Sequence, residues 1–197
     1  MKLALVSSLL SALAAAVPTA NSASTAGQPA AFTVTAARSA SPIHLLPMNA
    51  ANQSFWIGSK PSTYCPLAPE SCPPGNTTTF AGNGGALSVS VPGGQQIYVA
   101  PSGALKFTQA HSASTPPGSS YGPFAYEAGA QGSAFGHYTY SGWGANGFMA
   151  CPAPDHKWQV FAALHNATVP SGNVDDCLGF SALATPTNQT GQTWQYV

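Results

Sequence analysis

Proline and glycine interrupt this chain so often that a long helix has no room to form. Its 197 residues include 18 prolines and 20 glycines. Both residue types break the uninterrupted 3.6-residue periodicity that an amphipathic helix needs. The runs between them are short and rich in β-branched and aromatic residues, which favour strands. The sequence therefore predicts an all-β fold with almost no helix after its first segment.

Short strand-like runs recur along most of the chain, at intervals of about 8 to 12 residues. They cover residues 32–36, 43–46, 54–58, 77–80, 86–91, 96–100, 104–109, 124–127, 137–140, 147–150, 158–162, 180–184 and 193–197. This spacing is typical of a sandwich or a barrel-like fold, and the number of runs also fits a β-trefoil. The turns Pro92-Gly-Gly94 and Pro101-Ser-Gly103 join three of the runs into a predicted antiparallel meander.

The first residues have the features of a secretory signal peptide. Lys2 supplies a positive charge, and a short apolar run follows that ends in Ala14-Ala15-Ala16, small residues of the kind found at cleavage sites. Pro18 interrupts this run before it reaches the roughly 20 apolar residues of a membrane span. We predict a signal peptide over residues 1–16, with further cleavage sites up to residue 23, and a single domain over residues 24–197.

Charged residues are scarce, which restricts the partners of the chain. It has five Lys and Arg residues, five Asp and Glu residues and a formal net charge of zero. So few cations cannot neutralise many phosphates, and we expect neither nucleic acid nor a membrane as partner. Because 44% of the residues are hydrophobic, the chain has enough apolar surface to form a core and does not have the composition of a disordered protein.

Two further features agree with export. Four N-x-[ST] sequons begin at Asn52, Asn76, Asn166 and Asn188, and glycans on them would supply the hydration that charged side chains usually provide. The four cysteines lie outside the signal peptide, and an even number in a secreted chain suggests disulfides.

Four cysteines allow three pairings. We favour Cys65 with Cys72, which enclose a short proline-rich loop, and Cys151 with Cys177. Closing these two loops would stabilise the fold by about 2.5 and about 3.5 kcal/mol respectively. A zinc site would need a closer cysteine pair with nearby histidines, so this alternative fits the spacing poorly.

A glycine-rich region contains three aromatic residues that would suit a sugar-binding surface. Tyr138, Tyr140 and Trp143 could stack their rings on the apolar faces of pyranose sugars. The other interpretation is that they are ordinary core and edge residues of a β protein, and we favour it because aromatic residues more often serve packing.

The sequence predicts no catalytic residue, no cofactor and no metal. Glycosidases need two carboxylates across the scissile bond, and the few acids here include an adjacent pair, Asp175 and Asp176, and the isolated Glu127 and Asp155. The five histidines are scattered, without the spacing of metal ligands. We therefore expect that the protein is not an enzyme.

Several short segments recur in a characteristic order and spacing. Near the amino terminus and centre they are Phe32-Thr-Val-Thr-Ala-Ala-Arg38, Gly84-Gly-Ala-Leu87 and Gln95-Gln-Ile-Tyr-Val99. Toward the carboxyl terminus they are Gly147-Phe-Met-Ala-Cys-Pro152, Trp158-Gln-Val160 and Cys177-Leu-Gly179. Taken together, these segments resemble the PhiA family of fungal cell-wall proteins, which includes IgE-binding secreted antigens of moulds.

The resemblance implies a secreted, N-glycosylated and non-enzymatic wall protein that contributes to wall assembly and to conidium or phialide development. Its partner would be a cell-wall polysaccharide, and Cys151 and Cys177 would be the family's carboxyl-terminal cysteine pair. Two alternatives remain beside it: a secreted polysaccharide-binding module or host-interacting antigen and, less favoured, a glycan hydrolase.

Overall fold

The computed structural model describes residues 29–197, and the predicted signal peptide with its cleavage sites lies outside them. Within this part of the chain the strands are β1 (Ala31–Ala37), β2 (Met48–Ala51), β3 (Ser54–Ile57), β4 (Thr63–Tyr64), β5 (Phe80–Ala81), β6 (Ala86–Leu87), β7 (Gln95–Val99), β8 (Leu105–Phe107), β9 (Phe124–Glu127), β10 (Gly136–Tyr140), β11 (Phe148–Ala153), β12 (Lys157–Ala162), β13 (Leu178–Thr187) and β14 (Gln195–Tyr196). The helices are single 3-10 turns, η1 (Pro69–Ser71), η2 (Gly142–Gly144), η3 (Pro154–His156) and η4 (Val174–Asp176). The all-β prediction is confirmed.

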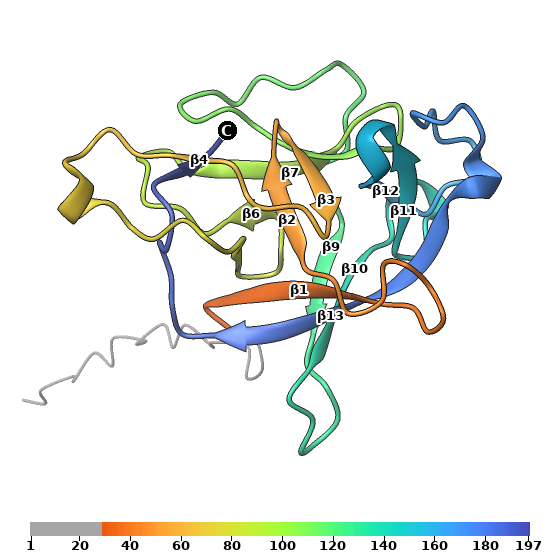
Figure 1. The fold of residues 1–197 in the computed structure, drawn as a ribbon, viewed down its shortest axis with the longest axis horizontal. Helices are drawn as coiled ribbons and strands as arrows, with labels where there is room; N and C mark the ends of the chain where they lie inside the picture. The colour runs from red at the N-terminus through yellow and green to blue at the C-terminus, as the bar shows by residue number, and fades with distance from the viewer. Residues whose placement is uncertain (1–28) are drawn as a thin grey trace, which may run out of the picture.

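Twelve strands form one antiparallel sheet that closes on itself (Figure 1). The hydrogen-bonded order β1-β5-β6-β7-β8-β3-β12-β11-β13 returns to its start because β13 also pairs with β1, with Ala31 opposite Thr187 and Ala37 opposite Ser181. The β10–β9 hairpin continues from β13, and β2 pairs with β3. This closed path matches the barrel-like form of the prediction, and its strand order has no threefold repeat of the kind a trefoil would show.

Most of the predicted strands are present, and the central meander is confirmed as β6, β7 and β8, but its first arm is shorter than predicted because β6 ends at Leu87 and residues 88–91 are not a strand. The strand predicted over residues 43–46 is wrong, because this segment between Pro42 and Pro47 is a series of turns. Ile43 is buried in the core and Leu46 packs against it, whereas Leu45 has a φ of +59° and is 61% exposed. The neighbouring strand is β2, whose sequence MNAA has no β-branched residue and which pairs along its whole length with β3.

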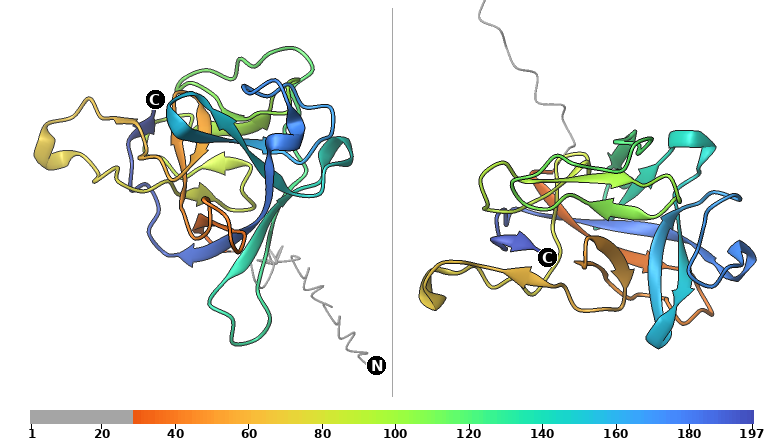
Figure 2. Two further views of the ribbon diagram at one scale, coloured as in Figure 1. Left: turned by 45° about the vertical axis from the view of Figure 1, so that its right-hand side comes forward. Right: turned by 90° about the horizontal axis from the view of Figure 1, so that it is seen from above.

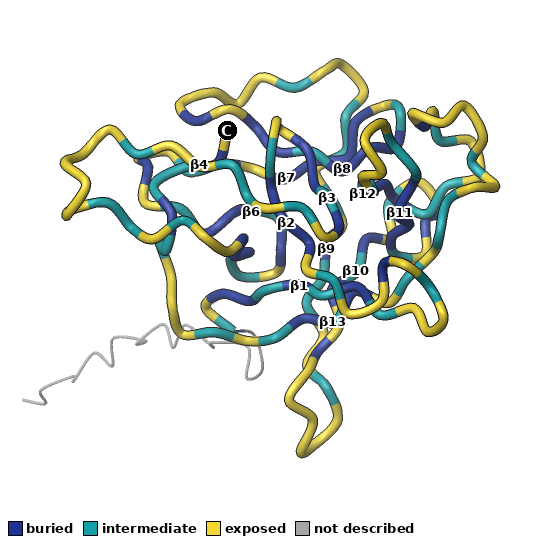
Figure 3. The backbone as a smooth tube through the Cα atoms, viewed as in Figure 1, coloured by how far each residue is buried: buried dark blue, intermediate teal, exposed yellow. Residues whose placement is uncertain are grey.

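The core is built around aromatic rings supplied by strands that are distant in sequence. The ring of Tyr138 lies 5.0 to 6.0 Å, between centroids, from the rings of Phe32, Phe80, Phe124 and Phe148. These contacts join β1, β5, β9, β10 and β11, so burial of the rings holds the closed sheet together. Figure 3 shows buried residues along the central strands and exposed ones along the peripheral loops.

A second, smaller apolar cluster lies on the other face of β11 and β12. It consists of Ala104, Met149, Cys151, Phe161 and Val169. Met149 and Phe161 are paired across the two strands, which places their side chains on the same face. The segment of residues 163–177 supplies Val169 and Cys177 to this cluster and so covers that face of the sheet.

A buried polar anchor fixes the carboxyl-terminal strand. Gln95 is 1% exposed, and its Nε2 donates to the carbonyl oxygens of Thr108 and Tyr196, both at 2.9 Å. Its Oε1 accepts the Tyr196 backbone N–H at 2.8 Å. The amide thus satisfies backbone groups of β14 that burial would otherwise leave unpaired.

Candidate functional site

The three aromatic residues predicted to stack on sugars occupy different environments. Tyr138 and Tyr140 are 1% and 0% exposed, whereas Trp143 is 49% exposed. Side chains along β10 alternate between the two faces of the strand, and both tyrosines point into the core. The interpretation favoured from the sequence, core packing, therefore fits Tyr138 and Tyr140, and the alternative of sugar stacking is wrong for both, because a ring without accessible surface cannot contact a ligand. Trp143 remains the candidate.

Trp143 is held at the tip of an unusual turn. It lies between Gly142 and Gly144 in η2 and has φ +54° and ψ +23°, in the left-handed region that few residues with a Cβ adopt. The turn is closed by the Ala145 N–H, which donates to the Gly142 carbonyl oxygen at 3.0 Å. Strained backbone at an exposed aromatic residue is a feature that directs attention to function.

Tyr140 packs against this turn from the core side. A Cβ built on Gly142 would lie 2.3 Å from the Tyr140 hydroxyl oxygen, so only glycine allows the turn to rest directly on the ring. The hydroxyl is buried and has no hydrogen-bond partner among residues 29–197. Tyr140 thus positions the backbone of Trp143 and makes no surface contact itself.

Trp143 borders a cavity of about 320 Å³ formed by four separate turns. The other lining residues are Pro101, Gly103, Gly118, Leu164, Asn166 and Ala167. Two contacts hold the walls together: the Thr168 N–H donates to the Ser102 carbonyl oxygen at 2.8 Å, and Gly103 packs closely against Ala167. Gly103 also has a φ of +88°, which glycine adopts without strain.

The chemistry of this cavity suits a neutral sugar. None of its seven lining residues is ionisable. The indole of Trp143 and the apolar surfaces of Pro101 and Leu164 would meet the C–H faces of a pyranose, and the amide of Asn166 offers a hydrogen-bond donor and acceptor. The sequence did not point to Pro101, Leu164 or Ala167, because these residues meet only when the turns after β7, β10 and β12 are brought together.

All four sequon asparagines are exposed, as a carbohydrate acceptor must be. Asn52 is at the tip of the β2–β3 hairpin, and Asn76, Asn166 and Asn188 lie in loops. Asn166 also lines the Trp143 cavity. Modification of these residues stays a prediction.

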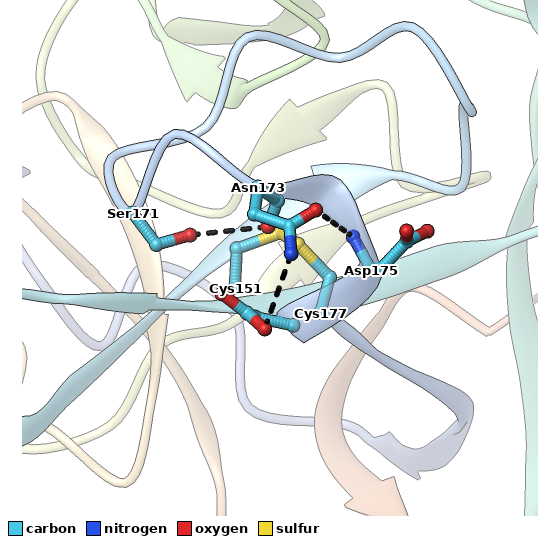
Figure 4. Close-up of a disulfide and its surroundings, with 6 residues drawn as sticks. Cys151, Ser171, Asn173, Asp175 and Cys177 are labelled. Carbon is cyan, nitrogen blue, oxygen red and sulfur yellow. Dashed lines mark hydrogen bonds between the residues drawn. A yellow bond between two sulfur atoms is a disulfide. The ribbon is translucent and has the colours of Figure 1, made fainter.

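Both predicted disulfides are confirmed, Cys65 with Cys72 and Cys151 with Cys177. The first closes a loop that projects from the body of the protein around η1 (Figure 2). The second joins β11 to the end of η4 (Figure 4). Beside it, the Asn173 side chain accepts the Asp175 N–H at 3.1 Å, and the Ser171 hydroxyl donates to the Asn173 carbonyl oxygen at 3.2 Å. These contacts fix the loop that covers the second apolar cluster.

The acidic residues are distributed over separate places. Glu127 is at the exposed end of β9, and Asp155 lies in η3 at the tip of the β11–β12 hairpin, 3.8 Å from the Lys157 ammonium. Within the described part of the chain, no three His, Cys, Asp or Glu side chains gather as metal ligands would. The same residues contain no helix long and apolar enough to cross a membrane.

Comparisons with known proteins point in one direction. Residues 32–197 match the family described as PhiA-like secreted protein. An uncharacterized secreted protein of the fungus Arthroderma benhamiae is 51% identical over 154 residues, which cover 77% of each of the two chains. No solved structure matches the chain.

Proposed function

Because the chain belongs to the PhiA-like secreted protein family, we propose that it is a non-enzymatic component of the fungal cell wall that contributes to wall assembly and to conidium development. In this proposal the protein is retained in the wall by contacts with neutral polysaccharide. Export brings it to the extracellular side, where polysaccharide is the material that surrounds it.

One observation carries this proposal: Trp143, 49% exposed and held in a left-handed turn, borders a cavity without ionisable side chains. The turn that carries the indole is already closed by the hydrogen bond from the Ala145 N–H to the Gly142 carbonyl oxygen, so binding needs little further ordering of this backbone. Polysaccharide chains present repeated apolar sugar faces to such a ring.

The scarcity of charge and the disulfides support a role as wall material. A chain with so few charged side chains needs hydration from another source, and glycans on the exposed Asn76 and Asn188, which line neither the Trp143 cavity nor the pocket beside Asn52, would provide it. Two disulfides add resistance to unfolding outside the cell, where chaperones do not repair damage.

The placement of the carboxylates supports a non-enzymatic role. Hydrolysis of a glycosidic bond uses two carboxylates on opposite sides of one sugar. Glu127 and Asp155 lie on different hairpins, and neither lines the Trp143 cavity. If the protein were instead a hydrolase, turnover on a panel of wall glycans would disappear in Glu127→Gln or Asp155→Asn.

The location of the protein in a growing culture tests the proposal. The tagged chain and its Trp143→Ala variant are expressed in a conidiating filamentous fungus, and the wall is separated from the medium. We expect the parent chain in the wall fraction and the variant in the medium. Recovery of both from the medium would contradict retention in the wall.

The exposed indole also favours a second candidate, a soluble polysaccharide-binding module. Such a module would be found mainly in the medium while still binding isolated polysaccharide through Trp143. Recovery from the medium together with Trp143-dependent binding in vitro would therefore identify the module. Recovery from the wall identifies the structural protein.

A further inference from the structure

The cations of this protein are concentrated on one outer face of the sheet. Among residues 29–197 there are four, and three of them, Lys60, Lys106 and Lys157, surround β3. On β3, Phe55 and Ile57 are buried in the core, so Ser54 and Trp56 face the opposite side. Lys106 is paired with Ser54, and Gln159 with Trp56, which brings these four residues to the same outer face.

Trp56 and two of the lysines form a second cavity on this face. Its volume is about 340 Å³, and Ala51, Asn52, Trp56, Ser59, Lys60 and Lys157 line it. The indole is fixed in place, because its Nε1–H donates to the Ala51 carbonyl oxygen at 2.9 Å. Lys60 and Lys157 are both exposed at the rim.

The third lysine extends the positive charge beside the cavity. The Lys106 ammonium donates to the Ser54 hydroxyl oxygen at 3.3 Å, and the Gln159 amide donates to the same oxygen at 3.5 Å. The acid that faces this group is Asp155, whose carboxylate lies 3.8 Å from Lys157. No other ion pair is formed among the residues the structure describes. Counted over side chains, this face has three cations against one carboxylate, although the formal charges of the whole chain cancel.

We propose that the Trp56 cavity binds a saccharide residue that carries an acidic group, a carboxylate or a phosphate. The indole of Trp56 contacts the C–H face of the sugar, while Lys60 and Lys157 bind the anion. Three cations confined to one face suit a single anionic sugar and are too few to hold a long polyanion. This site differs from the Trp143 cavity, which has no ionisable lining residue, so the inference does not depend on the proposed function.

Titration of the mature protein with three soluble probes tests the proposal. They are trigalacturonate, which carries carboxylates, mannose 6-phosphate, which carries a phosphate, and laminaritriose, which is neutral. Binding is measured by calorimetry and by tryptophan fluorescence in an Asn52→Gln background, because a glycan on Asn52 would stand at the same cavity. We expect an acidic probe to bind more tightly than laminaritriose and to bind less tightly as the salt concentration rises.

Matched variants locate the binding. Lys60→Gln and Lys157→Gln should each raise the Kd about threefold and the double variant about tenfold, as for partly exposed ion pairs. Arg38→Gln removes the fourth cation, which lies at the end of β1, and should leave the Kd unchanged. Trp56→Phe should abolish the fluorescence change.

The outcomes show which acidic group is bound and which of the two cavities binds the sugar. Preference for trigalacturonate identifies a uronic acid as ligand, and preference for mannose 6-phosphate identifies a phosphorylated sugar. Equal affinity for acidic and neutral probes, or an unchanged Kd in the double lysine variant, would overturn the proposal. Binding that is lost in Trp143→Ala but kept in the lysine variant would also overturn it, by placing the sugar in the other cavity.

Discussion

The hydroxyl of Tyr138 donates a hydrogen bond of 2.8 Å to the carbonyl oxygen of Gly84, 54 residues earlier in the chain. A Cβ on residue 84 would lie 2.1 Å from the Tyr138 ring, so glycine is required for the ring to lie in this position. Gly84 also has a φ of +88°. The pair fixes the turn between β5 and β6 to the centre of the aromatic core and explains why Tyr138 is buried.

Removing this hydroxyl should destabilise the fold. Tyr138→Phe leaves the buried Gly84 carbonyl oxygen without its donor, and we expect the free energy of unfolding to fall by about 1 to 3 kcal/mol. Tyr140→Phe is the matched control, because the Tyr140 hydroxyl is buried without a partner among the described residues, and its stability should be unchanged or higher. Urea unfolding measures both. Equal losses in the two variants would contradict this account.

Tyr138 should also make the fold sensitive to alkali. Burial raises the pKa of its phenol well above the ordinary value of 10.0, so the protonated form is favoured in the folded state. The resulting stability is complete below pH 10 and is lost as the pH rises above it, where the unfolded chain releases the proton. The Tm, measured by thermal unfolding between pH 9 and 11, should therefore fall less steeply with pH in Tyr138→Phe than in the parent protein.

Lys106 should give the folding stability the opposite dependence on pH. Partial burial lowers its pKa from the ordinary value of 10.5, so the charged form is favoured in the unfolded chain. Stability should then rise as the pH increases from the lowered pKa toward 10.5. Lys106→Met should be more stable than the parent at pH 7, and the difference should shrink toward pH 10.5. A less stable variant at pH 7 would show that the ammonium contributes more than its desolvation costs.

The two disulfides should differ in their effect on stability. Replacing Cys151 and Cys177 by alanine removes a link across the second apolar cluster, and we expect a loss of about 3.5 kcal/mol. The loop closed by Cys65 and Cys72 projects into solvent. Without this disulfide the loop would gain freedom in the folded state as well as in the unfolded state, so the loss of stability should be below about 2.5 kcal/mol. Denaturant unfolding of the two double variants gives the comparison, and a larger loss for the projecting loop would contradict it.

Intact-mass measurement of the secreted protein tests export and modification together. We expect a chain whose signal peptide has been cleaved after residue 16 or at a site up to residue 23. It should have no free thiols and should be heavier by N-glycans at two or more of the four sequons. Glycosidase treatment should return the mass to that of the bare chain. Free thiols or an unmodified full-length chain would contradict the prediction of a secreted glycoprotein.

Some features of the fold follow from local sequence alone. The proline and glycine spacing excludes long helices, and the turns Pro92-Gly-Gly94 and Pro101-Ser-Gly103 mark the meander β6–β8. The cysteine pairing followed from loop length and from the resemblance to the family. The closure of the sheet could not be predicted from local sequence, because it depends on pairing between β1 and β13, which lie about 150 residues apart.

Local sequence likewise predicts only part of the candidate site. Period-two alternation places Tyr138 and Tyr140 on one face of β10, but only the packing of β1, β5 and β9 decides that this face is the inner one. Trp143 follows the strand in a left-handed turn, so the alternation does not apply to it. Lys60 follows Trp56 closely in the sequence, whereas Lys106 and Lys157 reach this face only through the pairing of β3 with β8 and β12.

The most direct test of the account is a binding isotherm of the mature protein on insoluble wall glucan and chitin, made in an Asn166→Gln background to keep the cavity free of a glycan. Trp143→Ala is compared with Phe135→Ala, which removes another ring of 49% exposure from the β9–β10 loop. We expect saturable binding by the parent and by Phe135→Ala, and loss of binding in Trp143→Ala with an unchanged Tm. Undiminished binding by Trp143→Ala would contradict it.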